Sequence, residues 1–348
     1  MSTFQKFIQY YKPYKKVFIF DLICAAFISL VDLAYPQILR SLTKTLFLKD
    51  ASMILKTLPI IGGILFICYI FQAFCKYYVS CQGHIMGAQM ERDMRRKLFD
   101  HYENLSFSYY DQHNTGQMMS RLVSDLFDIS EAAHHGPENL FISLVKIVGS
   151  FIFLFIIQWK LAIILLAIVL LMIFFSAKQN RKMQATFLDN RRKIGDVNAS
   201  LQDSLAGIRI VQSFANEDIE REKFRVGNEA FLDSKRDNYR AMGSFQSGNT
   251  FFQGMMYLVT LLAGGYFIAL GQMSAADLAM YALYIGIFIS PIQILVELTE
   301  MIQKGMSGFI RYQSVIDIES EITDSVDAVN MKPVSYTHLR AHETLRHL

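Results

Sequence analysis

The sequence predicts an all-α membrane protein whose six membrane-spanning helices extend into the cytoplasm as long helical hairpins. Of its 348 residues, 52% are hydrophobic and only 19% are charged. Soluble domains average about 45–50% apolar and about 25% charged residues. The apolar residues are also gathered into six stretches of about the length needed to cross a hydrocarbon core of roughly 30 Å. Six such stretches leave too little polar surface for a soluble protein, and this class is excluded.

Each apolar stretch is expected to form one membrane helix, at residues 17–39, 58–80, 138–159, 161–180, 242–270 and 278–303. The first is the least apolar, because it contains Asp21 and Asp32 and is interrupted by Pro36. The third contains Lys146, and a two-residue turn separates it from the fourth. The fifth is the longest and has no charge.

Lysine and arginine in the connecting segments predict the orientation. Residues 82–137 and 178–241 are rich in basic residues, as is the N-terminus, whereas the third connection has only Lys160 and the last has none. The first hairpin loop disagrees, because it carries Arg40 and Lys44 among other basic residues. The majority places both termini and both long segments in the cytoplasm, for a multi-pass protein of the bacterial inner membrane.

Residues 82–137 and 178–241 are too long for simple loops. Apolar residues from Ile194 to Val211 recur at steps of three and four, which is a helical stripe. We therefore expect the membrane helices to continue as paired, water-exposed rods that reverse at their far tips. At the first tip, Asn114 or the residue after it is placed to cap the returning helix, and Asn216 is placed in the same way at the second.

This layout resembles the transmembrane domain of the ABC exporters over about residues 5–320. Four motifs carry the resemblance, in the family's order: residues 107–111 with 115–125, residues 205–214, residues 271–278, and Pro291 with Ile292. The chain is similar to a half-transporter of the multidrug and lipid exporter type. That implies a dimer, with an identical chain or a related one, around a cavity that opens alternately to each side of the membrane.

The resemblance also implies that a short coupling helix at each tip docks on an ATP-binding domain. The first coupling helix would comprise Tyr109, Tyr110, Asp111, Gln112, His113, Asn114, Thr115 and Gly116. The second would comprise Phe214, Ala215, Asn216, Glu217, Asp218 and Ile219. The implied substrate is amphiphilic or lipid-like, and ATP closure of the domains would open the cavity outward.

The sequence contains no GxxxxGK[ST] motif that would cradle phosphates. We expect residues 1–315 to form the transmembrane domain, residues 316–333 a linker toward a missing ATP-binding domain, and residues 334–348 a tail that is not native. No catalytic residue and no cofactor are expected on this chain, and ATP and Mg²⁺ belong to the missing domain. His338 and His342 in the tail are four residues apart, but we expect no metal site there.

Polar residues inside membrane helices are costly, so they usually face a bundle interior or water. Five of them are candidates for the substrate cavity: Asp32, Asn249, Gln253, Gln293 and Glu297. Hydrogen bonding between helices is the competing explanation for these positions. For Lys146 we expect a side chain that reaches toward the headgroups.

Other functions are less well supported by the residues. A six-helix channel or a membrane sensor that signals through its cytoplasmic rods is the main alternative, although no filter or ring of charge is visible. A membrane enzyme is disfavoured, because there is no HExxH motif and the histidines of the rods, His84, His113, His134 and His135, are expected to be solvated. The four cysteines are expected to be reduced packing residues. A net charge of +3 gives no indication of nucleic acid as a partner, so membrane lipid is the expected surrounding.

Overall fold

A computed structural model describes residues 3–321 and 327–329, and within them every regular element is a helix. The expected tail at 334–348 and part of the linker lie outside the described residues. The α-helices are α1 (Thr3–Gln9), α2 (Lys15–Ser41), α3 (Ala51–Tyr78), α4 (His84–Glu103), α5 (Phe107–Gln112), α6 (Thr115–Ser120), α7 (Leu126–Ala206), α8 (Ile208–Ser213), α9 (Glu217–Ala269) and α10 (Ala275–Ile316). A 3-10 turn covers Lys12–Tyr14, and π-helical turns cover Leu42–Leu46, Val79–Gly83 and Arg121–Asp125.

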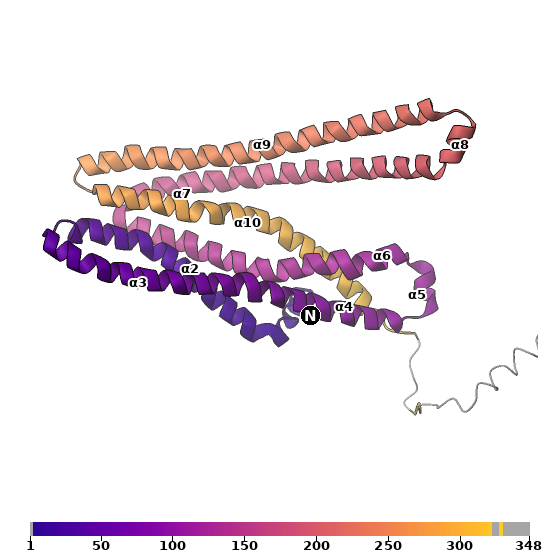
Figure 1. The fold of residues 1–348 in the computed structure, drawn as a ribbon, viewed down its shortest axis with the longest axis horizontal. Helices are drawn as coiled ribbons and strands as arrows, with labels where there is room; N and C mark the ends of the chain where they lie inside the picture. Colours follow the sequence, from indigo (N-terminus) through magenta and orange to yellow (C-terminus); the bar gives the residue numbers. More distant parts are fainter. Residues whose placement is uncertain (1–2, 322–326, 330–348) are drawn as a thin grey trace, which may run out of the picture.

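Five continuous helical stretches are long and apolar enough to cross a membrane. The stretch that contains α7 folds back on itself at Gln158, whose φ of −151° and ψ of 92° are not helical. Figure 1 shows the two limbs of α7 running in opposite directions. The hydroxyl of Tyr281 donates to the carbonyls of Leu154 and Gln158, at 2.7 and 2.8 Å, and so satisfies backbone groups near the break. The predicted fold with six crossings is therefore confirmed.

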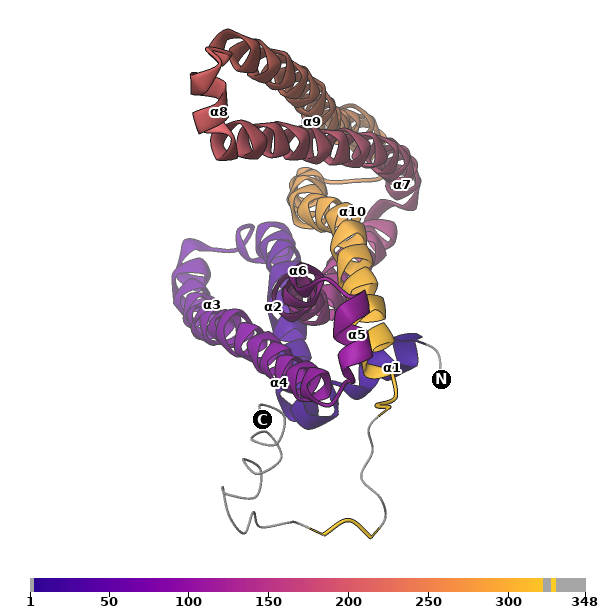
Figure 2. The same cartoon turned by 90° about the vertical axis from the view of Figure 1, so that its right-hand side faces the viewer.

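The helices continue beyond the membrane segments as two rods, as the periodicity predicted. One rod pairs α4 with the start of α7, and the other pairs the second limb of α7 with α9 (Figure 1). The tip built from α5 and α6 and the tip built from α8 lie at the same end of the molecule. Seen from that end, the α7–α9 arm stands apart from α2, α3 and α4 (Figure 2).

Two large apolar clusters hold the body together. The first joins both limbs of α7 to α9 and α10 and includes Leu165, Met256 and Tyr284. The second lies toward the tips and joins α1 and α4 to α7 and the end of α10, with Leu98 and Phe309 fully buried. Because α10 contributes to both clusters, it links the membrane part of the chain to the first rod.

Pro36 does not interrupt the first membrane helix, which corrects one expectation from the sequence. It is buried inside α2, and the helix runs on to Ser41 and into the π turn that follows. A proline removes one backbone hydrogen bond from a helix interior. Here α2 packs against α3, α7 and α10, and these contacts maintain the helix through the proline.

Two basic residues of the first hairpin loop, whose charges opposed the predicted orientation, are ion-paired. Arg40 Nε and Lys44 Nζ lie 2.5 and 2.6 Å from the carboxylate of Asp277, which is almost completely buried. Asp277 also forms a reciprocal cap with Ser274 at the start of α10. Burial alone would raise the pKa of Asp277, but hydrogen bonds from Lys44, Ser274 and Arg40 hold it well below its usual value. These two basic residues are therefore poor guides to membrane orientation.

Candidate functional site

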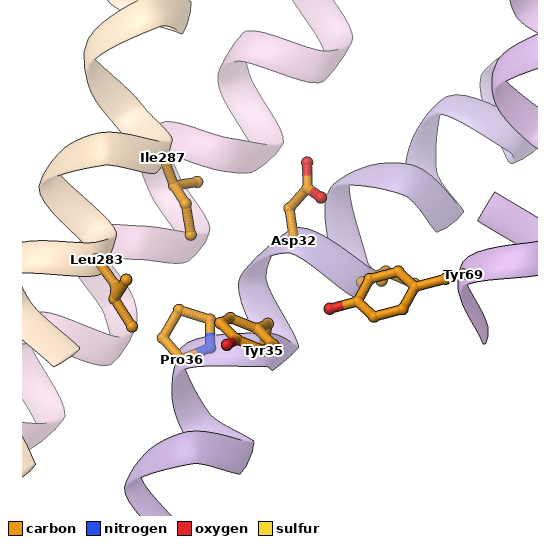
Figure 3. Close-up of a pocket in the computed structure, with 7 residues that line it drawn as sticks. Asp32, Tyr35, Pro36, Tyr69, Leu283 and Ile287 are labelled. Carbon is orange, nitrogen blue, oxygen red and sulfur yellow. The ribbon is translucent and has the colours of Figure 1, made fainter. Parts of the chain in front are cut away.

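A hollow of about 210 Å³ opens beside the middle of the first membrane helix. Figure 3 shows its lining side chains, which come from α2, α3 and α10. Polar and apolar groups share this surface, and the lining residues are Val31, Asp32, Tyr35, Pro36, Tyr69, Leu283 and Ile287. Pro36 thus contributes to the wall of the hollow.

Asp32 is the charged residue of this hollow, and its charge is balanced by a side chain from another helix. Lys146 Nζ on the first limb of α7 lies 2.6 Å from Asp32 Oδ2. Gln72 on α3 donates to Asp32 Oδ1 at 2.8 Å. An unpaired Asp at the centre of a membrane helix costs about 2.5–3.5 kcal/mol on insertion scales. The ion pair offsets this cost and leaves a polar, nearly neutral group at the edge of the hollow.

The structure does not bring the other expected cavity residues into this hollow. Asn249 is buried and its side-chain oxygen accepts a hydrogen bond from Ser176, so it fastens α9 to the second limb of α7. Gln253 and Gln293 are partly exposed and Glu297 is exposed, on α9 and α10. Lys146, which was expected to reach the headgroups, was missed as a member of the site. The sequence signal for it was the presence of opposite charges in two membrane helices.

The first tip contains two short helices. Residues 109–112 of the expected coupling helix lie in α5, His113 and Asn114 form a break, and Thr115 begins α6. Asn114 caps α6 by accepting from Gly116 N at 2.7 Å, which confirms one of the two caps considered. The His113 ring stacks on Tyr109 with the centroids 4.0 Å apart. Phe107 projects into solvent, with 85% of its surface exposed.

At the second tip, the short helix precedes the segment expected from the sequence. It is α8, Ile208–Ser213, and the expected segment 214–219 covers the turn after it and the first residues of α9. Ala215 has a φ of +50°, which a helix cannot contain and which ends the turn. Asn216 precedes α9 but forms no side-chain cap. Phe214 and Ile210 are largely exposed on this tip.

An ion pair between a half-exposed arginine and a buried aspartate connects the first tip to the last membrane helix. Arg311 on α10 forms two hydrogen bonds to Asp125, at 2.7 and 2.8 Å. Asp125 is buried and lies in the π-helical turn between α6 and α7. This paired, two-pronged geometry fixes orientation as well as distance. The pair therefore ties the end of the first tip to α10.

The comparisons with known proteins agree with this architecture. Residues 18–292, most of the chain, match the family described as the ABC transporter transmembrane region. The chain belongs to this family.

Three relatives illustrate how this ABC transporter transmembrane region relates to longer proteins. It is 36% identical, over 93% of its length, to the uncharacterized ABC transporter ATP-binding protein YwjA of Bacillus subtilis. It is 22% identical over 96% of its length to an ATP-dependent lipid A-core flippase of Syntrophus aciditrophicus. It is 24% identical over 94% of its length to the putative multidrug export ATP-binding/permease protein YgaD of Bacillus subtilis. The chain spans 56%, 55% and 57% of these three proteins.

Proposed function

We propose that this chain is the transmembrane part of an ATP-driven exporter that moves an amphiphilic or lipid-like substrate out of the cytoplasm by alternating access. One observation carries the proposal: both tips lie at the same end of rods that are continuous with membrane helices (Figure 1). A protein bound at that end moves both rods together. Rigid helices that shift as bodies are an established way to convert a distant closure into a change of access.

The tips are suited to an ATP-binding partner because they expose large apolar side chains. Phe107 on the first tip and Phe214 on the second have 85% and 72% of their surface exposed. Such groups are unfavourable in water and become favourable when they enter a partner's pocket. ATP and Mg²⁺ would be held by that partner. The relatives, which include an ATP-binding protein and a flippase, support the same assignment.

The hollow next to Asp32 supports a substrate with both polar and apolar parts. Tyr35 and Tyr69 offer amphipathic rings, Leu283 and Ile287 offer apolar surface, and Asp32 offers a carboxylate that is still 31% exposed beside Lys146. Binding sites of this kind are mostly apolar with a few polar groups that orient the ligand.

The proposal also includes a second half-transporter that pairs with this chain and an orientation with both termini in the cytoplasm. The α7–α9 arm exposes apolar residues such as Leu188 and Val226, which a second copy or a related chain would cover. Lys6 near the start of the chain pairs with Asp317 at the end of α10, at 2.8 Å, so both ends of the membrane domain lie together near the tips. With the basic rods, this supports cytoplasmic termini in a bacterial inner membrane.

Transport in inside-out vesicles tests the proposal. The chain is expressed with an ATP-binding domain joined to it or supplied separately, and uptake of a fluorescent phospholipid analogue and of an amphiphilic dye is followed. ATP should stimulate uptake of at least one probe, and a non-hydrolysable analogue should not. Phe214→Asp should abolish the stimulation, whereas Leu48→Asp, an equally drastic change at an exposed apolar residue in the turn between α2 and α3, should retain it. ATP-independent ion flux without uptake of either probe would instead support a channel.

A further inference from the structure

Three histidines that are distant in the sequence meet where α4 begins. His84 is the first residue of α4, and His134 and His135 lie on the first limb of α7. Nε2 of His134 is 3.1 Å from Nδ1 of His84. One ligand atom from each of the three rings lies within 4.8 Å of the other two. The expectation that these histidines are solvated is wrong for His134, which is only 3% exposed.

The separations suit a metal ion. Nitrogens bound to Zn²⁺ at 2.0–2.1 Å in tetrahedral geometry lie about 3.3 Å from one another. The His84 and His134 nitrogens already have about this separation. The nitrogen of His135 lies within 4.8 Å of the other two, so it needs to move by at most about 1.5 Å, which a rotation of this partly exposed ring provides. Imidazole is a ligand for divalent ions of the zinc, nickel and copper group.

Carboxylates are positioned at both edges of the cluster. Oε2 of Glu138 is 3.8 Å from His134 Nε2, and Oε2 of Glu131 is 3.7 Å from His135 Nε2. Each carboxylate is four residues from its histidine, so the sequence Glu-x-x-His-His-x-x-Glu places them on one face of α7. Glu138 is buried, with 6% of its surface exposed. It lies close enough to complete a set of three imidazoles and one carboxylate.

A carboxylate lies on the far side of the His134 ring, although no hydrogen bond joins the two in the structure. His134 Nδ1 is buried and has no hydrogen-bond partner among the described residues, and the same is true of Asp21 Oδ1. Both atoms lie next to Gly83, at 2.9 and 3.1 Å from the position that a Cβ would occupy there. A ligating histidine commonly donates its second ring N–H to a carboxylate, and Asp21 is the carboxylate available. Gly83 leaves the space that the ring fills.

Packing alone does not account for this cluster. Buried polar atoms without partners are rare in folded proteins, because each has lost its hydrogen bonds to water. Here two of them flank a ring whose other nitrogen faces a second imidazole and a buried carboxylate. His84 is exposed, so an ion can reach the cluster from the surface. The cluster shares no residue with the hollow beside Asp32.

We infer that His84, His134, His135 and Glu138 form a binding site for a divalent transition-metal ion of the zinc class, supported by Asp21. The ion fastens the start of α4 to the first limb of α7, and Asp21 extends the connection to α2. Metal binding at this site does not depend on the proposed transport function or on an ATP-binding partner.

Metal binding by the purified full chain in detergent tests the inference, with Zn²⁺ in equilibrium dialysis and Co²⁺ as the spectroscopic probe. One ion per chain should bind, with the visible absorption of tetrahedral Co²⁺. The double variant His84→Asn/His135→Gln removes two donors without touching the buried ring, and it should weaken binding at least about 100-fold. Loss of a carboxylate that supports a metal ligand typically lowers the affinity for the metal 10–100-fold, and Glu138→Gln should lower the affinity for Zn²⁺ at least this much.

The remaining histidines provide matched controls. His101→Asn, on the same helix as His84, and His338→Asn/His342→Asn, which removes the two histidines spaced four residues apart near the end of the sequence, should each retain tight binding of one ion. The inference is overturned if the His84/His135 double variant binds Zn²⁺ as tightly as the unmodified chain. It is equally overturned if the tail variant alone abolishes binding, or if no ion binds to the chain after metal-free purification.

Discussion

Replacing Lys146 with methionine should destabilise the membrane domain, because it leaves the Asp32 carboxylate without its counter-ion. The two side chains are 20% and 31% exposed and their charged atoms are 2.6 Å apart. Breaking a fully buried ion pair costs 3–5 kcal/mol. Partial exposure reduces this, so we expect a loss of about 2–3 kcal/mol in the free energy of unfolding.

The reverse change, Asp32→Asn, should cost less, about 1–2 kcal/mol, because the long stem of Lys146 can carry its ammonium toward the headgroups. The double variant Asp32→Asn/Lys146→Met carries no unpaired charge at this site. It should therefore be more stable than Lys146→Met alone, which requires a coupling energy between the two positions larger than the cost of Asp32→Asn, about 2–3 kcal/mol.

Unfolding of the detergent-solubilised chain by SDS titration, followed by far-ultraviolet circular dichroism, measures these energies. Lys160→Met is the matched control: Lys160 is exposed and close to the Trp159 ring, 5.9 Å from its centroid, so it should change stability by less than about 0.5 kcal/mol. A coupling energy below about 0.5 kcal/mol would contradict the claim that Lys146 stabilises the Asp32 carboxylate inside the membrane.

Three other predictions use the same unfolding measurement. Arg311→Met should cost about 2 kcal/mol, because it leaves buried Asp125 unpaired; a change below about 0.5 kcal/mol would contradict a tight link between the first tip and α10. Gly305→Ala should cost about 1–3 kcal/mol, since its Cβ would lie 2.8 Å from a backbone carbonyl of α7, whereas Gly265→Ala, which meets nothing within 4 Å, should be neutral or slightly stabilising. Burial, with the neighbouring His135 and His84, lowers the pKa of His134 to about 3 in the folded chain. In the unfolded chain the pKa is about 6.5, so the stability that the neutral ring contributes is complete above pH 6.5 and is lost as the pH falls below it. With a chelator present, the difference in the free energy of unfolding between the unmodified chain and His134→Gln should therefore fall by about 2 kcal/mol from pH 8 to pH 5; this difference separates the contribution of the ring from that of the neighbouring carboxylates Asp21 and Glu138.

The sequence predicted the features that depend on neighbouring residues. Continuous apolar stretches located the membrane helices, and periodicity located the rods, because both are properties of one helix in one environment. The cap at Asn114 was also predictable, since a cap acts within three residues. The boundary at the second tip was not: the chain ends α8 at Ser213 because Ala215 adopts a left-handed backbone, and no glycine signalled that conformation.

Contacts across long sequence separations escaped prediction. Lys146 and Asp32 are 114 positions apart, and His84 and His134 are 50 apart, so only the packing of α2, α4 and α7 shows that they meet. Each residue considered alone has an ordinary explanation, such as reaching to the headgroups or to water. The pairing of Arg40 with Asp277 has the same origin, so the sequence alone did not show that this charge of the first hairpin loop has a partner.

The straight course of α9 makes it a lever. At 1.5 Å per residue, its 53 residues span about 80 Å from the second tip to the far side of the membrane. A tilt of about 5° at one end of such a rod displaces the other by about 7 Å, which is more than the width of a hydrocarbon chain. The charge pairs that repeat along its outer face, from Asp218 with Arg221 to Asp237 with Arg240, join successive turns. An angular change too small to disturb the packing at the tip is therefore large enough to separate helices on the opposite side of the bilayer.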